Sequence, residues 1–385
     1  MQFHITKSQK DIQKAAKEFA RGEFEKSLCL EMEKSGEFYE SIRRKAAELG
    51  FLAVHFPEEQ GGIGLGMLET ALVAEAFCER DASAGIVLML SGFGAECLLR
   101  FGSDEQKSAL LPGILSGTAL CATAFAETAA SFGLAGISTT ARKEPGHWVI
   151  DGHKAQVLNA GAASFYLVLC RIATNGDAAA AGQTGIFLVE ADREGISVVN
   201  SGRRFGLRMI KTGDLCMEKV HVNGTNLLGK LGQGLQQALW FSMHARILIS
   251  ALALGTARGA FLRALDYTGQ RVQFGKKIGQ FPVIRQKLAQ MALLIEESAL
   301  LTYSAAWHFD QGKSDDAMVA MAKLSACNAS VQVASEAVQL LGGYGYMAEY
   351  EVERYLREAK VLSVLEGNSL WMNDLIAQKL MGKMR

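Results

Sequence analysis

The scarcity of proline most constrains how this chain folds. Only four of its 385 residues are prolines: Pro57, Pro112, Pro145 and Pro282. Because proline interrupts helices, the long proline-free stretches between them suit long helices. Near the N-terminus, apolar residues from Ile12 to Ala20 recur at helical spacing. Much of the chain is therefore expected to be helical.

Residues 1–118 are predicted to form an N-terminal helical domain. Gly50 is expected to end one of its helices. Ser103-Asp-Glu-Gln106 has the pattern of a capping box at the start of another. The expected helices include Phe38–Leu49, Met67–Cys78 and Ala84–Phe101.

The pattern changes near Ala119, where short strand-like runs begin. Trp148-Val-Ile-Asp-Gly-His-Lys154 is predicted to form strand, turn, strand, with Asp151-Gly152 as the hairpin turn. Glycine and Asn/Asp residues separate the later strands. These are expected at Phe165–Ile172, Gly185–Glu190, Ile196–Asn200 and Leu215–Val222. Residues 119–230 are therefore predicted to form a small β domain.

From residue 231 onward the pattern is helical again. Helices are expected at Leu235–Tyr267, Pro282–Asp310 and Asp315–Leu341, each longer than the mean of about 11–12 residues. Long antiparallel helices with apolar, alanine-rich faces indicate a four-helix bundle over residues 231–385. The predicted fold class is α+β: helical domain, β domain, bundle. A cleft between the last two could hold a flat cofactor.

Composition narrows the possible partners. Lys plus Arg and Asp plus Glu each number 40, which favours neither nucleic acid nor an anionic membrane. The seven cysteines are scattered without a CxxC or Cys/His cluster, so reduced thiols are expected, and no metal. The N-terminus has no apolar targeting segment, and no uncharged apolar run reaches the ~18 residues of a membrane span. A cytoplasmic protein is expected.

Three short segments carry residues suited to chemistry. In Arg271-Val-Gln-Phe-Gly-Lys-Lys277, the Arg can clamp a phosphate and Phe274 can stack on a planar ring, although the same residues suit a basic surface loop. Gln339-Leu-Leu-Gly-Gly-Tyr-Gly345 either lets the backbone approach a ligand or turns a corner. Glu366 follows an apolar run, so it is either a solvated loop residue or a partly desolvated carboxylate suited to act as a base.

In this order and spacing, the segments resemble the C-terminal region of acyl-CoA dehydrogenases. That family typically has Arg-x-x-Phe-Gly, Gln-x-x-Gly-Gly-x-Gly-Tyr, Val-Glu-Arg-x-x-Arg-Asp-Ala-Lys and Glu-Gly-Thr. The resemblance covers nearly the whole chain, including Phe56-Pro-Glu-Glu-Gln-Gly-Gly62, Phe101-Gly-Ser-Asp-Glu-Gln106 and Phe205-Gly-Leu-Arg208. It implies an FAD enzyme that desaturates an acyl thioester. Glu366 falls on the base that removes the α-proton, while flavin N5 accepts the β-hydride.

The resemblance also assigns binding residues. Arg271, Gln273 and Phe274 fall on a loop that contacts FAD across a subunit interface. Gln339, Gly342 and Gly343 fall on the segment that meets the FAD diphosphate and adenosine, again in the neighbouring subunit. A dimer or homotetramer is implied, with an electron-transferring flavoprotein as electron acceptor. Arg246 matches a helix arginine near the base and the thioester of acyl-CoA or an acyl carrier protein.

The expected flavin seat departs from the family pattern. Ala126-Glu-Thr-Ala-Ala-Ser-Phe-Gly133 replaces Thr-Glu-Pro-x-x-Gly-Ser-Asp, so Phe132 takes the place of a serine that serves the cofactor or CoA phosphates. Gln156 stands where an aromatic ring packs on the flavin, and Leu158 where a hydroxyl lies near N5. Asn368 replaces a threonine beside FAD, and Met243 replaces an aspartate that often meets CoA.

Three hypotheses follow from the resemblance and its departures. The first is a homo-oligomeric dehydrogenase with an atypical pocket, which a retained base at Glu366 favours. The second is a companion subunit that completes the FAD site of a related catalytic subunit and has little activity alone. The third is a non-redox scaffold or thioester-binding protein. Because position 158 lacks a hydroxyl, oxidase activity is also conceivable.

Overall fold

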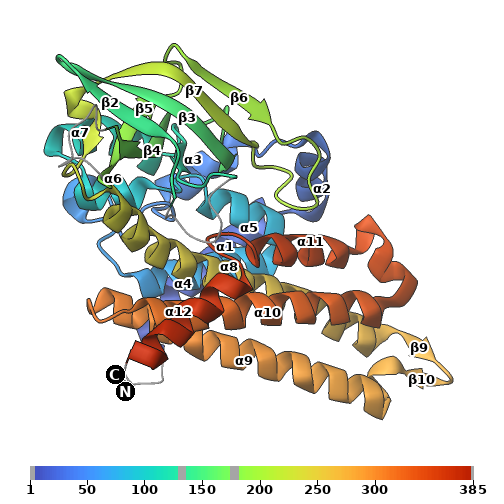
Figure 1. Cartoon of the computed structure of the whole chain (residues 1–385). Helices are drawn as coiled ribbons and strands as arrows, with labels where there is room; N and C mark the ends of the chain where they lie inside the picture. Colours follow the sequence, from blue (N-terminus) through green and yellow to red (C-terminus); the bar gives the residue numbers. More distant parts are fainter. Residues whose placement is uncertain (1–4, 129–135, 174–181, 383–385) are drawn as a thin grey trace.

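The N-terminal region is helical, as predicted. The computed structural model describes residues 5–128, 136–173 and 182–382 (Figure 1). The helices of this region are α1 (Lys7–Glu23), α2 (Lys26–Ser35), α3 (Glu40–Glu48), α4 (Met67–Arg80), α5 (Ala82–Met89), α6 (Ala95–Phe101) and α7 (Asp104–Leu115). The capping box at α7 is confirmed: the Ser103 hydroxyl accepts from Gln106 N–H, and the Gln106 side chain accepts from Ser103 N–H.

One predicted helix is wrong in its extent. The run Ala84–Phe101 is divided into α5 and α6, and Ser91-Gly92-Phe93-Gly94 forms turns between them. Two glycines within four residues weaken helix propensity enough for tertiary packing to redirect the chain. Gly50 lies one residue beyond the C-cap Leu49 of α3, in the left-handed conformation.

The middle region forms a mixed sheet. Its strands are β1 (Cys121–Ala124), β2 (Thr140–Glu144), β3 (His147–Leu158), β4 (Phe165–Ile172), β5 (Thr184–Glu190), β6 (Ile196–Asn200), β7 (Thr212–Asn223) and β8 (Leu227–Leu228). The order is β6-β7-β3-β2-β4-β5-β8, and β1 pairs with β4 in parallel. The predicted bounds of β4 and β6 are confirmed.

The predicted hairpin turn at Asp151-Gly152 is wrong. Both residues lie inside the continuous strand β3, and the turn occurs instead at Pro145-Gly146, between β2 and β3. At Gly152 the register of β3 against β7 shifts, and a Cβ there would lie 2.6 Å from Thr139. The Asp151 carboxylate accepts the Lys219 N–H of β7 at 2.8 Å. The Asp-Gly pair therefore accommodates a bulge instead of a turn.

The C-terminal region is a bundle of long helices. It comprises α8 (Gly234–Gln270), the hairpin strands β9 (Val272–Gln273) and β10 (Lys276–Lys277), α9 (Pro282–Asp310), α10 (Asp316–Leu341), α11 (Val352–Leu362) and α12 (Ser369–Gly382). The predicted bounds of α9 are confirmed. Among the described residues only α8 is long and apolar enough to cross a membrane, and 83% of its most apolar window is buried inside the protein. That burial is typical of a core helix.

The three regions share one apolar core. Figure 1 shows the sheet at one end of the molecule, α9 and α10 at the other, and α4, α5 and α8 between them. The largest hydrophobic cluster combines Cys97 of α6, Leu158 of β3, Phe241 of α8 and Leu362 of α11. Residues from all three regions therefore meet near the middle of α8.

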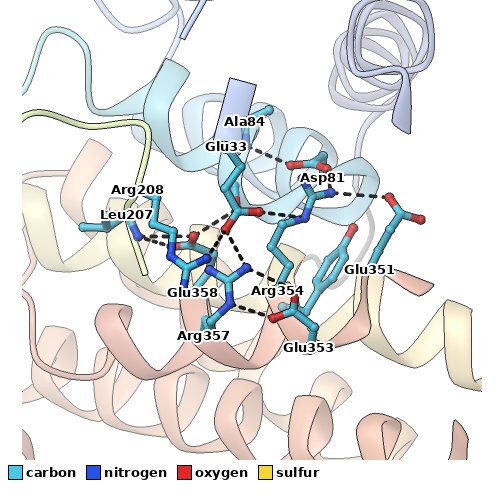
Figure 2. Close-up of polar contacts among 12 residues, drawn as sticks. Glu33, Asp81, Ala84, Leu207, Arg208, Glu351, Glu353, Arg354, Arg357 and Glu358 are labelled. Carbon is cyan, nitrogen blue, oxygen red and sulfur yellow. Dashed lines mark hydrogen bonds and ion pairs between the residues drawn. The ribbon is translucent and has the colours of Figure 1, made fainter. Parts of the chain in front are cut away.

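A buried polar network holds α11 against the N-terminal helices (Figure 2). Arg354 pairs with Asp81, and Arg357 pairs with Glu33 of α2. The Glu358 carboxylate accepts from Ser83 Oγ and from Leu207 N–H, both at 2.9 Å. The charged motif at 354–360 thus anchors α11, and with it the segment that follows.

Candidate active site

Glu366 lies on the short connection between α11 and α12. Its backbone is left-handed, with φ of 53°, which is uncommon for a residue with a side chain. The next residue, Gly367, has φ of 112°, and a Cβ there would lie 2.6 Å from the Trp371 ring. Strained backbone of this kind persists only where its surroundings hold it. The turn therefore requires glycine at position 367, and its surroundings hold Glu366 in a conformation that a residue with a side chain seldom adopts.

Residues of α8 and α10 hold the connection in place. Ser242 Oγ donates to Glu366 Oε2 at 3.0 Å, and Arg246 Nε donates to the Glu366 carbonyl at 3.0 Å. These two residues are four apart and so share one face of α8. From α10, Lys323 Nζ donates to the carbonyl of Ser363 at 2.9 Å and to that of Gly367. Sequence analysis found Arg246 by resemblance but missed Ser242 and Lys323.

The environment of Glu366 shifts its acidity. The side chain is partly buried, and desolvation raises the pKa of its carboxyl group. Arg246, Ser242 and Lys323 act in the opposite direction without cancelling the rise. Of the two interpretations open from the sequence, the desolvated carboxylate is the one the structure contains. A raised pKa brings a carboxylate closer to what a general base needs near neutral pH.

Arg246 offers an unused hydrogen-bond donor beside this carboxylate. The residue is only 1% exposed, and its guanidinium carbon lies 4.6 Å from the centre of the Trp371 ring. Its Nη2 is buried and has no hydrogen-bond partner among the described residues. Desolvation lowers the pKa of Arg246, but an arginine stays charged. Such an orphaned cationic donor fits a carbonyl oxygen or an anionic group of a ligand.

Met243 and Leu158 are both associated with the largest apolar core cluster. Leu158 belongs to the core cluster that includes Leu362, and the half-buried Met243 packs against that cluster. Leu365, next to the base, packs there as well. The three side chains therefore belong to, or pack against, one apolar cluster.

The other residues assigned to the flavin seat that the structure describes do not belong to this apolar cluster. The Gln156 side chain is exposed, and its backbone N–H donates to Asp214 Oδ1 at 2.9 Å. The Asn368 Oδ1 accepts the Trp371 N–H at 3.1 Å and so caps α12, beside an open cavity of about 410 Å³ between α10 and α11. Phe132 lies outside the described residues.

Glu127 anchors the segment that leads into this seat, a role not foreseen from sequence. Its carboxylate pairs with Lys154 Nζ at 2.7 Å and accepts the backbone N–H groups of Ser138 at 2.7 Å and Thr139 at 3.0 Å. Although desolvation acts against them, these bonds lower the pKa of Glu127 to about 2. The ionised carboxylate therefore joins the segment after β1 to β3 and to the residues before β2.

The two glutamine-containing motifs lie far from Glu366 within one chain. Arg271, Gln273 and Phe274 are exposed at the β9–β10 hairpin, which projects beyond the bundle (Figure 1), and Phe274 is 92% exposed. Arg271 follows Arg246 by 25 residues along α8, about 37 Å at 1.5 Å per residue. These hairpin residues therefore cannot serve the same subunit's Glu366.

The second motif, residues 339–345, lies at the same end of the bundle as the β9–β10 hairpin. Gln339, Gly342 and Gly343 are exposed at the end of α10, and the following Tyr344 ring lies 6.1 Å from that of Tyr267 near the end of α8. No atom of the residues that the structure describes lies within 4 Å of a Cβ built at either glycine. Open backbone beside an exposed arginine and an exposed aromatic ring suits a phosphate-bearing, planar ligand.

A partly buried carboxylate with a raised pKa thus lies beside a guanidinium whose Nη2 has no hydrogen-bond partner among the described residues. Family models described as the N-terminal, middle and C-terminal domains of acyl-CoA dehydrogenase match residues 6–118, 122–220 and 232–381. An acyl-CoA dehydrogenase of Bacillus subtilis (strain 168) is 35% identical over 382 residues, which cover 98% of this chain and 99% of that protein.

Solved structures agree with these sequence matches. The butyryl-CoA dehydrogenase of Megasphaera elsdenii aligns with a TM-score of 0.92 and 30% identity, covering 99% of this chain and 100% of that one. A glutaryl-CoA dehydrogenase in complex with glutaryl-CoA aligns with a TM-score of 0.93 and 30% identity, covering 99% and 97%. The chain belongs to the acyl-CoA dehydrogenase family. It is an oxidoreductase acting on CH–CH groups of acyl thioesters, with FAD as its cofactor.

Proposed function

We propose that this chain catalyses the α,β-desaturation of an acyl thioester, with Glu366 as the base that removes the α-proton. The observation that carries the proposal is the partly buried Glu366 carboxylate, whose pKa is raised by desolvation. Ser242 orients the carboxylate through its bond to Oε2, which leaves the other oxygen to take a proton. An idle subunit would have no need of such a base.

Arg246 supports the same step electrostatically. Its charge faces the base, and its unpartnered Nη2 can donate to an oxygen that gains negative charge as the proton leaves. Donors set in a partly desolvated site stabilise developing charge without reorganising first. When bound, FAD supplies the acceptor for the hydride that leaves the β-carbon.

The residues that would hold FAD come from two subunits. Leu158 and Asn368 would lie on the cofactor of their own chain. The distance of about 37 Å along α8 supports donation of Arg271, Gln273 and Phe274, with Gln339, Gly342 and Gly343, to a neighbour. We therefore propose a homo-oligomer, a dimer or a tetramer, that takes acyl-CoA as substrate and passes its electrons to an electron-transferring flavoprotein.

The test compares the parent protein with Glu366→Gln after reconstitution with FAD. The parent is expected to bind FAD and to desaturate at least one member of an acyl-CoA panel that spans short, branched, aromatic and dicarboxylic acyl groups. The variant should keep its flavin absorbance but lose 10²–10⁴-fold in turnover, the usual contribution of a general base. Near-parental turnover in the variant would refute Glu366 as the base. Parallel assays with acyl carrier protein thioesters identify the carrier.

A companion subunit of a hetero-oligomer is the second candidate. The exposed Gln156 and the apolar Leu158, in place of an aromatic ring and a hydroxyl, favour it, while the motifs donated to a neighbour are intact. A chain that stays colourless with FAD, yet restores flavin binding to a co-expressed related dehydrogenase, would establish this role. Phe274→Ala should abolish that restoration, because the ring is exposed for the neighbour's site.

A further inference from the structure

Three potential metal ligands converge on the side of α8 away from the base. His55 follows α3 in the chain, Glu96 lies on α6 and His244 lies on α8. Their ligand atoms all lie within 4.8 Å of one another. His55 Nε2 is 3.5 Å, and His244 Nε2 3.9 Å, from the same oxygen, Glu96 Oε1. Two of the residues are almost fully buried, with Glu96 8% and His244 2% exposed.

A hydrogen-bond chain fixes which nitrogen of His55 faces the carboxylate. The Thr70 hydroxyl donates its single proton to the Gly66 carbonyl at 3.1 Å. It must therefore accept from His55 Nδ1, which lies 3.2 Å away. In the neutral ring the lone pair of Nε2 then faces Glu96 Oε1, so two acceptors confront each other unless a proton or a cation lies between them.

Neither histidine nor the carboxylate is satisfied in this pocket. His55 Nε2, His244 Nε2 and Glu96 Oε2 are all buried without a hydrogen-bond partner among the described residues. A buried carboxylate needs a compensating positive charge.

The geometry suits a tetrahedral ion. Zinc bonds of 2.0–2.2 Å to nitrogen and oxygen place neighbouring ligand atoms about 3.4 Å apart. The two histidine nitrogens lie 3.5 and 3.9 Å from Glu96 Oε1, and all three ligand atoms lie within 4.8 Å of one another, so small side-chain shifts would complete the site. A cavity of about 30 Å³, lined by all three residues, adjoins them. It has room for one water, which can complete the coordination. The Thr70 bond to His55 Nδ1 is the outer contact that orients a metal-binding imidazole.

We propose that His55, Glu96 and His244 bind one divalent transition-metal ion, for which Zn²⁺ is the best chemical match. The ion would join the N-terminal helices to α8. Because His244 is two residues from Ser242, about 200° around the helix, the ion faces away from Glu366 and acts as a structural clamp. Sequence analysis expected no metal because the cysteines form no CxxC or Cys/His cluster, and positions 55, 96 and 244 are too far apart to form a spacing motif.

The experiment uses the full-length, FAD-loaded protein, stripped with a chelator and then incubated with Zn²⁺ and desalted. Elemental mass spectrometry should find one zinc per chain. The melting temperature should rise by several degrees with increasing free Zn²⁺, because the ion binds only the folded state. Mg²⁺, which prefers oxygen ligands, should cause no such rise. Zinc below a tenth of an equivalent would overturn the proposal.

Variants show whether the zinc is bound at this cluster. Glu96→Gln and His55→Gln should each retain less than a tenth of the parental zinc. His55 is 16% exposed at its side chain, so its variant tests the proposal even if the buried Glu96 variant misfolds. The control is His147→Gln/His221→Gln, which removes a stacked pair with centroids 5.0 Å apart near Glu144, where adventitious zinc could collect. Zinc kept by His55→Gln, or lost only from the control, would contradict the assignment.

Discussion

The bond from Ser242 to Glu366 offers a direct measure of how the protein sets the strength of its base. Ser242 is 2% exposed, and its hydroxyl donates to Glu366 Oε2 at 3.0 Å. This bond favours the ionised carboxylate and so opposes the rise in pKa that desolvation causes. Replacing Ser242 with alanine removes the donor while leaving the helix and the Arg246 contact in place. The pKa of Glu366 should therefore rise further.

The size of the effect follows from the kind of bond that is lost. A hydrogen bond to a charged group contributes about 1.5–3 kcal/mol. At 1.36 kcal/mol per pH unit, its loss should move the titration of Glu366 upward by about one to two pH units. Because the base must be ionised to accept a proton, the acid limb of the kcat/KM profile should move by the same amount, with the high-pH plateau largely kept.

Two assays measure this shift. One is the pH dependence of kcat/KM with a dye as electron acceptor. The other follows the infrared carbonyl band of protonated Glu366, identified by its absence in Glu366→Gln, and does not depend on turnover. Ser250→Ala is the matched control, since Ser250 is also buried on α8 but bonds the Arg246 carbonyl instead. An unmoved titration in Ser242→Ala, or an equal shift in the control, would refute the reasoning.

Three further predictions concern the supports of the site. Arg354→Met leaves the buried Asp81 without its ion-pair partner, so it should cost about 3–5 kcal/mol of unfolding free energy in urea titrations. Glu127→Gln should cost about 3 kcal/mol at neutral pH, from the fall of its pKa from 4.5 to about 2. Since a depressed carboxyl pKa stabilises the fold only above the unfolded value, that cost should shrink as the pH falls from about 4.5 towards 2, which unfolding at several pH values would measure. Gly367→Ala forces a Cβ to within 2.6 Å of Trp371 at a positive φ, and should lower the melting temperature and turnover together.

Each prediction has an outcome that would contradict it. An Arg354→Met protein as stable as the parent would mean that water reaches Asp81. A Glu127→Gln cost that grows in acid would reverse the assigned sign. For Gly367, the comparison is Gly22→Ala on α1, where no atom of the described residues lies within 4 Å of the added Cβ. If both alanine variants behaved alike, steric strain at Gly367 would not be the cause.

Regular elements could be predicted where local pattern was enough. The bounds of α9, β4 and β6 follow from proline position and side-chain periodicity, which depend on neighbours in the chain. The hairpin placed at Asp151-Gly152 failed because that dipeptide is equally suited to a bulge. The pairing of β3 with β7, more than 50 residues away, decided between the two. Similarly, the glycines after Leu90 allow a helix break but do not require one.

The candidate site also contains some residues that a local sequence pattern reveals and others that it does not. Glu366 could be picked out from its own segment, because an apolar run before a Glu-Gly pair is a contiguous signal. The helix-borne partners Ser242 and Lys323 carried no such signal, nor did the cluster of His55, Glu96 and His244.

The sequence by itself determined the helical and strand segments, the resemblance to a family and the identity of the candidate base. Only the tertiary structure decided that the Glu366 carboxylate is desolvated, which groups oppose that effect, and that the hairpin motif is out of reach of its own active site. The physical reason is that periodicity is a local property, whereas burial, charge pairing and reach depend on residues brought together from distant parts of the chain.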